Sequence, residues 1–220
     1  MAFPDRGKER ALGIFLGLLV SCEIFIPDFR GPGPWLGGAL LVAFAAHLFS
    51  DGKLEERYQR LGRTLLGALY VGYLVPHLIL VFESPYGREW IFFILLVMMS
   101  GDTAGYFVGT RLGEKKLAAG ISPAKTVEGA VGSIGASLIV GTIGGNYLLP
   151  SISKLEIVLL SLVLNILGQT GDLFESWVKR VFAAKDSSNL LPGHGGLLDR
   201  LDSLIFPFVF TAYYLRLLHS

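Results

Sequence analysis

The chain has 220 residues, of which 52% are hydrophobic and only 17% are charged. A soluble domain usually carries about a quarter charged residues, and here the charges cluster between long apolar runs, so the composition excludes an ordinary soluble protein and indicates a polytopic membrane protein. The formal net charge of +1 points to no particular class of partner, and we expect no nucleic acid among the partners.

The apolar runs are candidates for helices that cross the lipid bilayer. Most of them reach the roughly 17–25 residues that are needed to cross about 30 Å of hydrocarbon. Only a helix satisfies its own backbone groups within one segment in lipid, so the predicted fold class is all-α, as a single membrane domain over residues 1–220. The seven predicted spans, in chain order, are Ala11–Ile26, Trp35–Phe49, Leu65–Phe82, Trp90–Val108, Val127–Leu149, Leu155–Leu173 and Leu204–Leu218.

The 19 Lys and Arg residues are distributed unevenly between the connections. The N-terminal segment and every second loop hold three, four, four and four of them, whereas the other loops and the C-terminal end hold one each. By the positive-inside rule, this pattern predicts an integral protein of the cytoplasmic (inner) membrane, with its N-terminus in the cytoplasm and its C-terminus outside. The polar loops described below then lie on the cytoplasmic side.

A carboxylate interrupts the fourth apolar run, "IFFILLVMMSGDTAGYFVGTRLG", at Asp102. A charge inside a membrane helix is costly and normally faces a polar cavity or a partner, so Asp102 is a candidate functional residue. The glycines and Thr103 around it predict an irregular or tightly packed turn at that depth.

The loop after this run reads "GISPAKTVEGAVGS". A phosphate-binding P-loop is disfavoured, because Ala124 stands where that motif has glycine and no strand is expected before it. Lys125 and Thr126 are expected beside a helix N-terminus, whose unpaired N–H groups suit an anion such as a phosphate. A plain helix start that uses only Thr126 and Glu128 is the alternative.

The sixth apolar run continues into the polar sequence "GQTGDLFESWVKRVFAAKD". Asp172, Glu175, Ser176 and Lys179 stand at positions i, i+3, i+4 and i+7, so one helical face carries all four. An isolated Glu–Lys pair would be ordinary surface chemistry, but this face leaves an apolar run directly, where unpaired charge is expensive. We therefore expect it to be functional.

The stretch "KDSSNLLPGHGGLLDRLDS" precedes the last apolar run. Its glycine-rich turn would let the backbone approach a ligand closely, and His194 within the turn could donate to a phosphate oxygen or transfer a proton. Asp199 and Asp202 stand at i and i+3 and can share a face on the entry to the last span.

Together, these loops place carboxylates, Lys and Arg residues, hydroxyl side chains and a glycine-rich turn on one side of the membrane. Mg²⁺ binds through one or two carboxylates and substrate phosphates, and Lys and Arg suit phosphate oxygens. No Cys/His set has the spacing of zinc ligands, and no Ser–His–Asp order indicates a hydrolase. The residues therefore predict metal-assisted phosphoryl or nucleotidyl transfer at the membrane surface.

The run from Ser176 to Asp202, "SWVKRVFAAKDSSNLLPGHGGLLDRLD", resembles the signature of the phosphatidate cytidylyltransferase family, also called CDP-diacylglycerol synthases. Upstream, "GDTAGY" and "SPAKTVEG" resemble two further motifs of this family, in the same order. The resemblance covers roughly Trp90 to the C-terminus, so we expect a catalytic region in 90–220 and N-terminal helices without a recognised motif in 1–89. Members of the family are typically longer, with additional apolar segments before the matched part.

The resemblance implies transfer of a cytidylyl group from CTP to phosphatidic acid, giving CDP-diacylglycerol and pyrophosphate in phospholipid biosynthesis. It implies Mg²⁺ in a two-metal site, whose ligands by position are Asp172 and Asp199, with Asp186, Asp202 and Asp102 as further candidates. The implied catalytic residues are Asp172, Lys179, Asp199 and Asp202, together with His194 as polar support without an assigned role as a base. The residues expected to contact the substrates are Ser122, Lys125, Thr126, Ser176, Arg180, Lys185 and Arg200.

Two other functions are weighed against this prediction. A membrane transporter for an anionic substrate would suit Asp102 and the glycine-rich helices, but a transport site should be reachable from both faces of the membrane. Another CTP-dependent lipid enzyme, such as a polyprenol kinase, is the second alternative. The predicted partners are CTP, phosphatidic acid and the lipid bilayer, and a homodimer is considered as the assembly.

Overall fold

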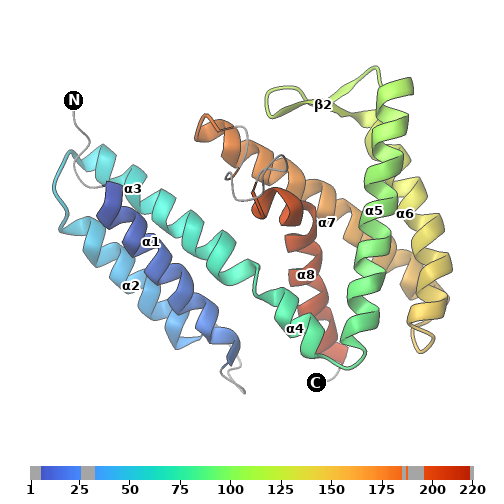
Figure 1. Ribbon diagram of the computed structural model, residues 1–220, viewed down its shortest axis with the longest axis horizontal. Coiled ribbons are helices and arrows are strands. Elements are labelled where there is room, and N and C mark those ends of the chain that lie inside the picture. Colours follow the sequence, from blue (N-terminus) through green and yellow to red (C-terminus); the bar gives the residue numbers. More distant parts are fainter. Residues whose placement is uncertain (1–5, 26–32, 185–186, 188–195, 219–220) are drawn as a thin grey trace. The chain divides into compact units, whose positions relative to one another are not determined.

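A computed structural model of the chain describes residues 6–25, 33–184, 187 and 196–218, and these residues are mainly helical (Figure 1). The chain divides into two compact units, residues 1–80 and 81–220, each of which is described by itself. The expectation that both belong to one membrane domain stays a prediction.

The first unit packs its helices through small and aliphatic side chains. Its elements are α1 (Arg6–Ser21), the 3₁₀ turn η1 (Cys22–Phe25), α2 (Pro34–Leu48), α3 (Leu54–Gly67), the π-helical segment η2 (Ala68–Leu74) and the beginning of α4 (His77–Glu83). Its core contains Leu16, Val20, Ala39, Ala43 and Ala68. The apolar stretch that continues from α3 was expected to begin near Leu65, but helical structure already begins at Leu54, within the expected connector.

The second unit contains four longer helices and one hairpin. The helices are α5 (Gly87–Leu112), α6 (Val127–Leu148), α7 (Lys154–Val181) and α8 (Leu198–Leu218). Helix α6 packs against both α5 and α7, and α8 packs mainly against α7 (Figure 1). Buried apolar side chains between them include Trp90, Phe93, Ile94, Val97, Ile157, Leu164 and Phe208.

Helix α5 passes through Asp102 without an irregular turn, contrary to one of the two predicted alternatives. The tight packing that was the other alternative is present. A Cβ atom at Gly105 would lie 3.4 Å from the Gly129 carbonyl oxygen, so α5 and α6 approach closely just beyond Asp102.

A hairpin joins α5 to α6, and the sequence did not predict it. Strand β1 (Lys116–Ala118) pairs antiparallel with β2 (Ser122–Thr126), with Lys116 opposite Thr126. The segment lacks the alternation of apolar and polar residues by which a strand is recognised, and Pro123 disfavours a strand in a larger sheet. Each strand has only one neighbour, so Pro123 is tolerated here.

Helices α7 and α8 meet through backbone contacts. A Cβ atom at Gly171 would lie 2.5 Å from the Asp202 carbonyl oxygen, and one at Gly168 would lie 2.9 Å from that of Ser203. Pro207 has no N–H group, so the Ser203 carbonyl lacks its usual partner four residues later in α8. This close approach brings the first turns of α8 beside the part of α7 that carries Asp172.

Each of the seven predicted spans overlaps helical structure in the described residues, but the count of seven spans is not confirmed. In the part of the chain that the structure describes, five helical segments are long and apolar enough to cross a membrane: Leu54–Glu83, Gly87–Leu112, Val127–Leu148, Lys154–Val181 and Leu198–Leu218. Helix α2 is apolar but shorter, with 15 residues, and α1 has 16 residues. The all-α, membrane-type architecture is therefore supported, with the short hairpin as an addition.

Candidate functional site

The first part of the site joins the hairpin to α7. Lys125, on strand β2, forms an ion pair with Asp172 of α7 at 2.5 Å between Nζ and Oδ2. Ser176 lies one turn further along α7 and donates to the other oxygen of Asp172 at 3.5 Å. Asp102 of α5 is close enough to Asp172 and Lys125 for electrostatic interaction with both. Residues from three elements therefore converge here.

The second part joins α7 to α8 through a lysine shared by two carboxylates. Lys179 Nζ lies 2.5 Å from Glu175 Oε2 and 2.9 Å from Asp199 Oδ1. The Glu175 side chain is only 1% exposed, compared with 20% for Lys179 and 12% for Asp199. In the described part of the chain, Glu175 Oε1 has no hydrogen-bond donor, and the charge of Glu175 is balanced by the Lys179 ammonium beside Oε2.

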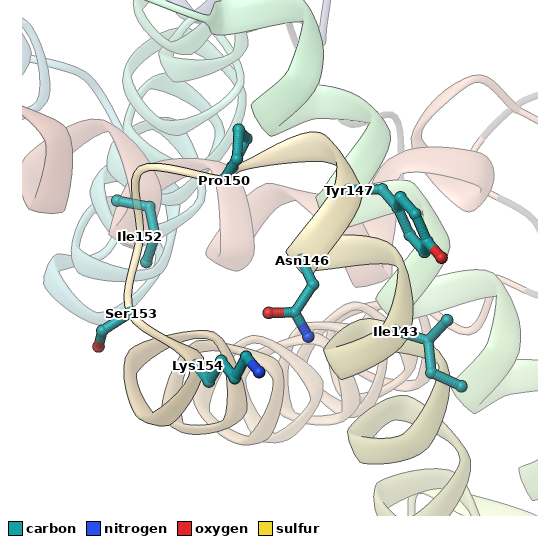
Figure 2. A pocket seen from close by; sticks show the side chains of 7 residues that line it. All are labelled: Ile143, Asn146, Tyr147, Pro150, Ile152, Ser153 and Lys154. Carbon is teal, nitrogen blue, oxygen red and sulfur yellow. The ribbon is translucent and has the colours of Figure 1, made fainter.

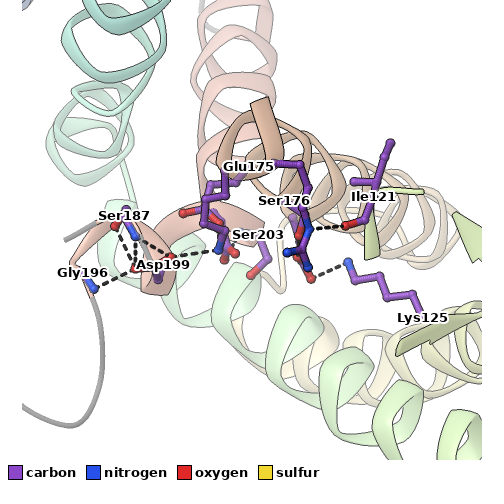
Figure 3. A network of polar contacts seen from close by, with 12 residues as sticks. Ile121, Lys125, Glu175, Ser176, Ser187, Gly196, Asp199 and Ser203 are labelled. Carbon is purple, nitrogen blue, oxygen red and sulfur yellow. Dashed lines mark hydrogen bonds and ion pairs between the residues drawn. The ribbon is translucent and has the colours of Figure 1, made fainter. Parts of the chain in front are cut away.

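Asp199 also binds backbone on both sides of a segment that lies outside the described residues. Its Oδ2 accepts hydrogen bonds from Ser187 N at 2.9 Å, from Ser187 Oγ at 2.8 Å and from Gly196 N at 2.7 Å (Figure 3). Asp199 lies in the first turn of α8, where the helix dipole favours a negative charge. This carboxylate therefore holds Lys179, Ser187 and Gly196 together.

The hairpin is attached to the helices at both of its ends. The Arg180 guanidinium of α7 donates from Nε to the Ile121 carbonyl at 3.2 Å, next to Ser122 (Figure 3). At its base, Glu128 Oε2 accepts from the backbone N–H groups of Glu114 and Lys115 at 3.1 and 3.2 Å. These contacts fix the strand that carries Lys125.

Thr126 caps the N-terminus of α6, as expected for the plain helix start that was the alternative to a phosphate site. It is buried, and its Oγ1 accepts a hydrogen bond from Gly129 N at 3.1 Å, which caps the helix. A substrate contact by Thr126 stays a prediction.

Asp202 and Arg200 lie in the first two turns of α8. Asp202 is half-buried, and the charges of Asp172, Glu175 and Lys179 all act on its carboxyl group. Arg200 is exposed. Lys185, Asp186 and His194 were also predicted as site residues, but they lie outside the described residues.

The carboxylates of this cluster are the candidate ligands for Mg²⁺. Among the residues that the structure describes, no group of three His, Cys, Asp or Glu side chains is placed to hold a metal ion. The cluster is nevertheless rich in carboxylate oxygens, and Glu175 Oε1 has no hydrogen-bond donor among the described residues. Mg²⁺ is commonly held by one or two carboxylates together with substrate phosphates, so these residues fit an ion bound jointly with a phosphate substrate.

Two features of this region were missed by the sequence analysis. Glu175 was placed on the polar face of α7 but was not counted among the site residues, and its deep burial depends on packing that a single sequence does not display. Asn165 and Gln169 were not singled out at all, although they precede Asp172 on the same helix face at i, i+4 and i+7. That spacing is the signal by which they could have been found.

An open cavity lies at the other end of α6, where α6 turns into α7. Its volume is about 580 Å³, and its lining includes Asn146, Tyr147 and Lys154 (Figure 2). Among the described residues, no carboxylate lines this cavity. Its chemistry therefore differs from that of the acidic and basic cluster around Asp172.

Comparison with known proteins gives the family of this chain. A sequence model described as "Cytidylyltransferase family" matches residues 4–218. The chain belongs to the cytidylyltransferase family. The match includes residues 4–89, in which no family motif was recognised, so membership of the cytidylyltransferase family does not depend on the C-terminal signature alone.

Three relatives illustrate the extent of the similarity. The phosphatidate cytidylyltransferase of Bacillus subtilis is 41% identical over 161 residues, which are 73% of this chain and 60% of the relative. That of Brucella suis is 44% identical over 140 residues, covering 63% and 52%, and that of Staphylococcus saprophyticus is 41% identical over 197 residues, covering 87% and 73%. The chain thus spans between about half and three quarters of the length of these relatives.

Proposed function

We propose that this chain transfers a cytidylyl group from CTP to phosphatidic acid, forming CDP-diacylglycerol and pyrophosphate. The similarity to three proteins named phosphatidate cytidylyltransferase supports this proposal. The observation that carries it at the level of residues is the pairing of Lys125 with Asp172 and of Lys179 with Asp199, which joins residues of different predicted family motifs. Neither the transporter nor another CTP-dependent lipid enzyme has a comparable observation in its favour.

In the proposed reaction, an oxygen of the lipid phosphate attacks the α-phosphorus of CTP. A new P–O bond forms, the bond between the α-phosphorus and the oxygen that bridges to the β-phosphorus breaks, and pyrophosphate leaves with that electron pair. Negative charge collects on the attacking, transferred and leaving groups, so fixed cations lower the barrier by electrostatic preorganisation. This chain's contribution is therefore to hold positive charge and to orient the two phosphate substrates.

Lys125 and Lys179 are the described cations best placed for this role. Each ammonium group is already held by a carboxylate, Lys125 by Asp172 and Lys179 by Glu175 and Asp199, so each is positioned before the substrate binds. Arg180, Ser122 and Ser176 lie beside them and are proposed to bind phosphate oxygens. Arg200, Thr126, Lys185 and His194 keep the substrate or supporting roles that the resemblance implies.

We also propose Mg²⁺ as the cofactor, held by Asp172 and Asp199. The further candidate ligands are Asp186, Asp102 and Asp202. When bound, Mg²⁺ would neutralise the charge of the triphosphate and polarise its phosphoryl oxygens. In the described residues, Asp199 is engaged by Lys179 and by two backbone N–H groups, so we expect these contacts to rearrange when the ion and CTP bind together.

We infer that the cluster faces the cytoplasm, where CTP is available, with the N-terminus on the same side and the C-terminus outside. The distribution of Lys and Arg residues supports this orientation in the cytoplasmic membrane. A site at the membrane surface can receive a water-soluble nucleotide and a lipid headgroup together. A homodimer is compatible with this proposal and is not required by it.

The proposal is tested with purified chain in mixed micelles. Wild-type protein with CTP, Mg²⁺ and phosphatidic acid should release pyrophosphate, and release should depend on each of the three additions. Replacement of phosphatidic acid by phosphatidylcholine, which lacks a free phosphate monoester, is the matched control. No pyrophosphate release with phosphatidic acid, or uptake of an anion into sealed vesicles instead, would contradict the proposal.

A further inference from the structure

A network of neutral polar side chains is buried between α5, α6 and α7. Asn165 and Ser137 are completely buried, and Ser133 is 4% exposed. Asn165 Nδ2 donates to Ser133 Oγ at 2.9 Å and to Ser137 Oγ at 2.8 Å. Ser137 Oγ in turn donates to the Val97 carbonyl of α5 at 2.7 Å. One amide group therefore connects α7 to both neighbouring helices.

Gln169 extends this network by one turn of α7 toward Asp172. Its Nε2 donates to Asn165 Oδ1 at 2.6 Å and to the Ala130 carbonyl of α6 at 3.3 Å. Both N–H groups of the Asn165 amide and both of the Gln169 amide therefore have partners. Hydrogen bonds require a narrow range of distances and angles, so this network restricts both the rotation of α7 and its position along the helix axis relative to α6.

The network also contacts the helix position next to Asp102. A Cβ atom at Gly101 would lie within 3 Å of Asn165 Nδ2, Ser133 Oγ and Ser137 Oγ. Only glycine at position 101 lets α5 approach these three polar atoms so closely. The same group of side chains thus touches α5 immediately before Asp102 and α7 one turn before Asp172.

We propose that Asn165 and Gln169 are positioning residues, which set the depth and rotation of α5 and α7 so that Asp102 and Asp172 meet Lys125. This inference rests on the proposed function. Interhelical hydrogen bonds within membranes contribute modestly to stability, because the polar groups find other partners when helices separate. Their value here is geometric, since a displacement of about 1 Å at a reacting group can cost about 100-fold in rate.

The test replaces both amides with apolar side chains of similar size, in the double variant Asn165→Leu/Gln169→Leu. Ser137 keeps its bond to Val97, so the variant should fold, with a melting temperature in detergent close to that of the wild type. We expect kcat to fall by about 10-fold or more, with the KM for CTP changed by less than about threefold. Because kcat is expressed per folded molecule, a merely structural role would leave it unchanged.

Ser161→Ala is the matched control. Ser161 is also fully buried on α7, one turn before Asn165, but its Oγ donates to Ile157 of its own helix at 2.8 Å. This variant should keep the wild-type kcat. If the double variant does not fold, Gln169→Leu alone provides the test. The expected fall in kcat is then about threefold, which is smaller than the loss in rate caused by a displaced reacting group.

The outcomes separate the two proposals. Wild-type kcat in the double variant, or in Gln169→Leu where only that variant folds, overturns the positioning role while the proposed function stands. An equal fall in kcat in Ser161→Ala also overturns it, because the effect would not belong to the interhelical network. No transfer by the wild-type protein overturns the proposed function and this inference with it.

Discussion

Two polar clusters lie on α7, one around Asn165 and Gln169 and one around Glu175 and Lys179, and they differ in charge and in how their hydrogen-bonding groups are used. The Asn165 cluster is neutral, buried and paired through both of its amides. The cluster around Lys179 is charged, and the buried carboxylate of Glu175 has an ion pair at Oε2 but no hydrogen-bond donor at Oε1 among the described residues. Both clusters join α7 to other elements.

The difference in charge and hydrogen bonding indicates that the two clusters have different roles. A buried neutral network is stable only when all of its members are satisfied, as expected of a part that fixes helix positions. A buried carboxylate oxygen without a hydrogen-bond donor is costly, and such groups concentrate at functional sites. We therefore infer that the charged cluster is arranged to receive a further ligand, whereas the neutral cluster is complete in itself. The following predictions test that contrast, beginning with the largest expected effect.

Lys179→Met should remove activity and also destabilise the protein. It leaves Glu175 and Asp199 close together without the ammonium group between them, and breaking a buried ion pair in this way costs about 3–5 kcal/mol. Unfolding in denaturant and pyrophosphate release measure the two effects. Lys154→Met, at the exposed start of the same helix, is the control and should change neither. Unchanged stability in Lys179→Met would refute the charge balance described for this cluster.

Glu175→Gln should separate activity from stability. Lys179 keeps its ion pair with Asp199, and no buried carboxylate remains at position 175, so the free energy of unfolding should change by less than about 1 kcal/mol. Positioning of the Lys179 ammonium is weakened, so we expect kcat to fall by about 10-fold, the effect of about 1.4 kcal/mol on the barrier. Steady-state kinetics with CTP measure the change. A wild-type kcat would show that Glu175 serves only to balance charge.

Arg180→Lys should affect binding of the nucleotide more than the chemical step. Lysine keeps the positive charge but lacks the Nε that donates to the Ile121 carbonyl, so the hairpin is held less firmly. The KM for CTP should rise by a few-fold, about the effect of one lost hydrogen bond, with little change in kcat. A lowered kcat with an unchanged KM would instead place Arg180 in the chemical step.

Thr126→Ala should have the smallest effect, on stability. The loss of the Oγ1 cap of α6 costs about 1 kcal/mol, and Thr126→Ser should restore most of it. Thermal unfolding of the two variants gives the comparison. A large rise in the KM for CTP in Thr126→Ala, absent in Thr126→Ser, would add the predicted substrate contact to the capping role.

The sequence alone was sufficient to predict local features that repeat with the helical period or form long apolar runs. Helical spacing placed Asp172, Glu175, Ser176 and Lys179 on one face, and α7 carries all four in a continuous helix. The apolar runs located the helices, although α7 extends to Val181, beyond the predicted end of its span at Leu173. Helix continuation past the apolar run is favoured by the charged pairs at i and i+4, which apolar length does not measure.

Features that depend on contacts distant in sequence were not predicted. The bonds from Asn165 to Ser133 and Ser137 join residues 32 and 28 positions apart, and isolated polar residues in apolar runs do not indicate which partners they meet. The β1–β2 hairpin was missed for a different reason, because "SPAKT" contains proline and lysine and lacks the alternating pattern of a strand. The role of Lys179 as a bridge required the position of Asp199 on α8.

The central claim is that the charged cluster of α7 carries cytidylyl transfer. The most direct measurement uses CTP labelled on its α-phosphorus, with phosphatidic acid and Mg²⁺, for the wild type, Asp172→Asn and the control Asp51→Asn in the loop before α3. The account predicts label in the lipid fraction for the wild type and Asp51→Asn, and at least about 100-fold less for Asp172→Asn. Equal transfer of label by Asp172→Asn and the wild type would contradict it.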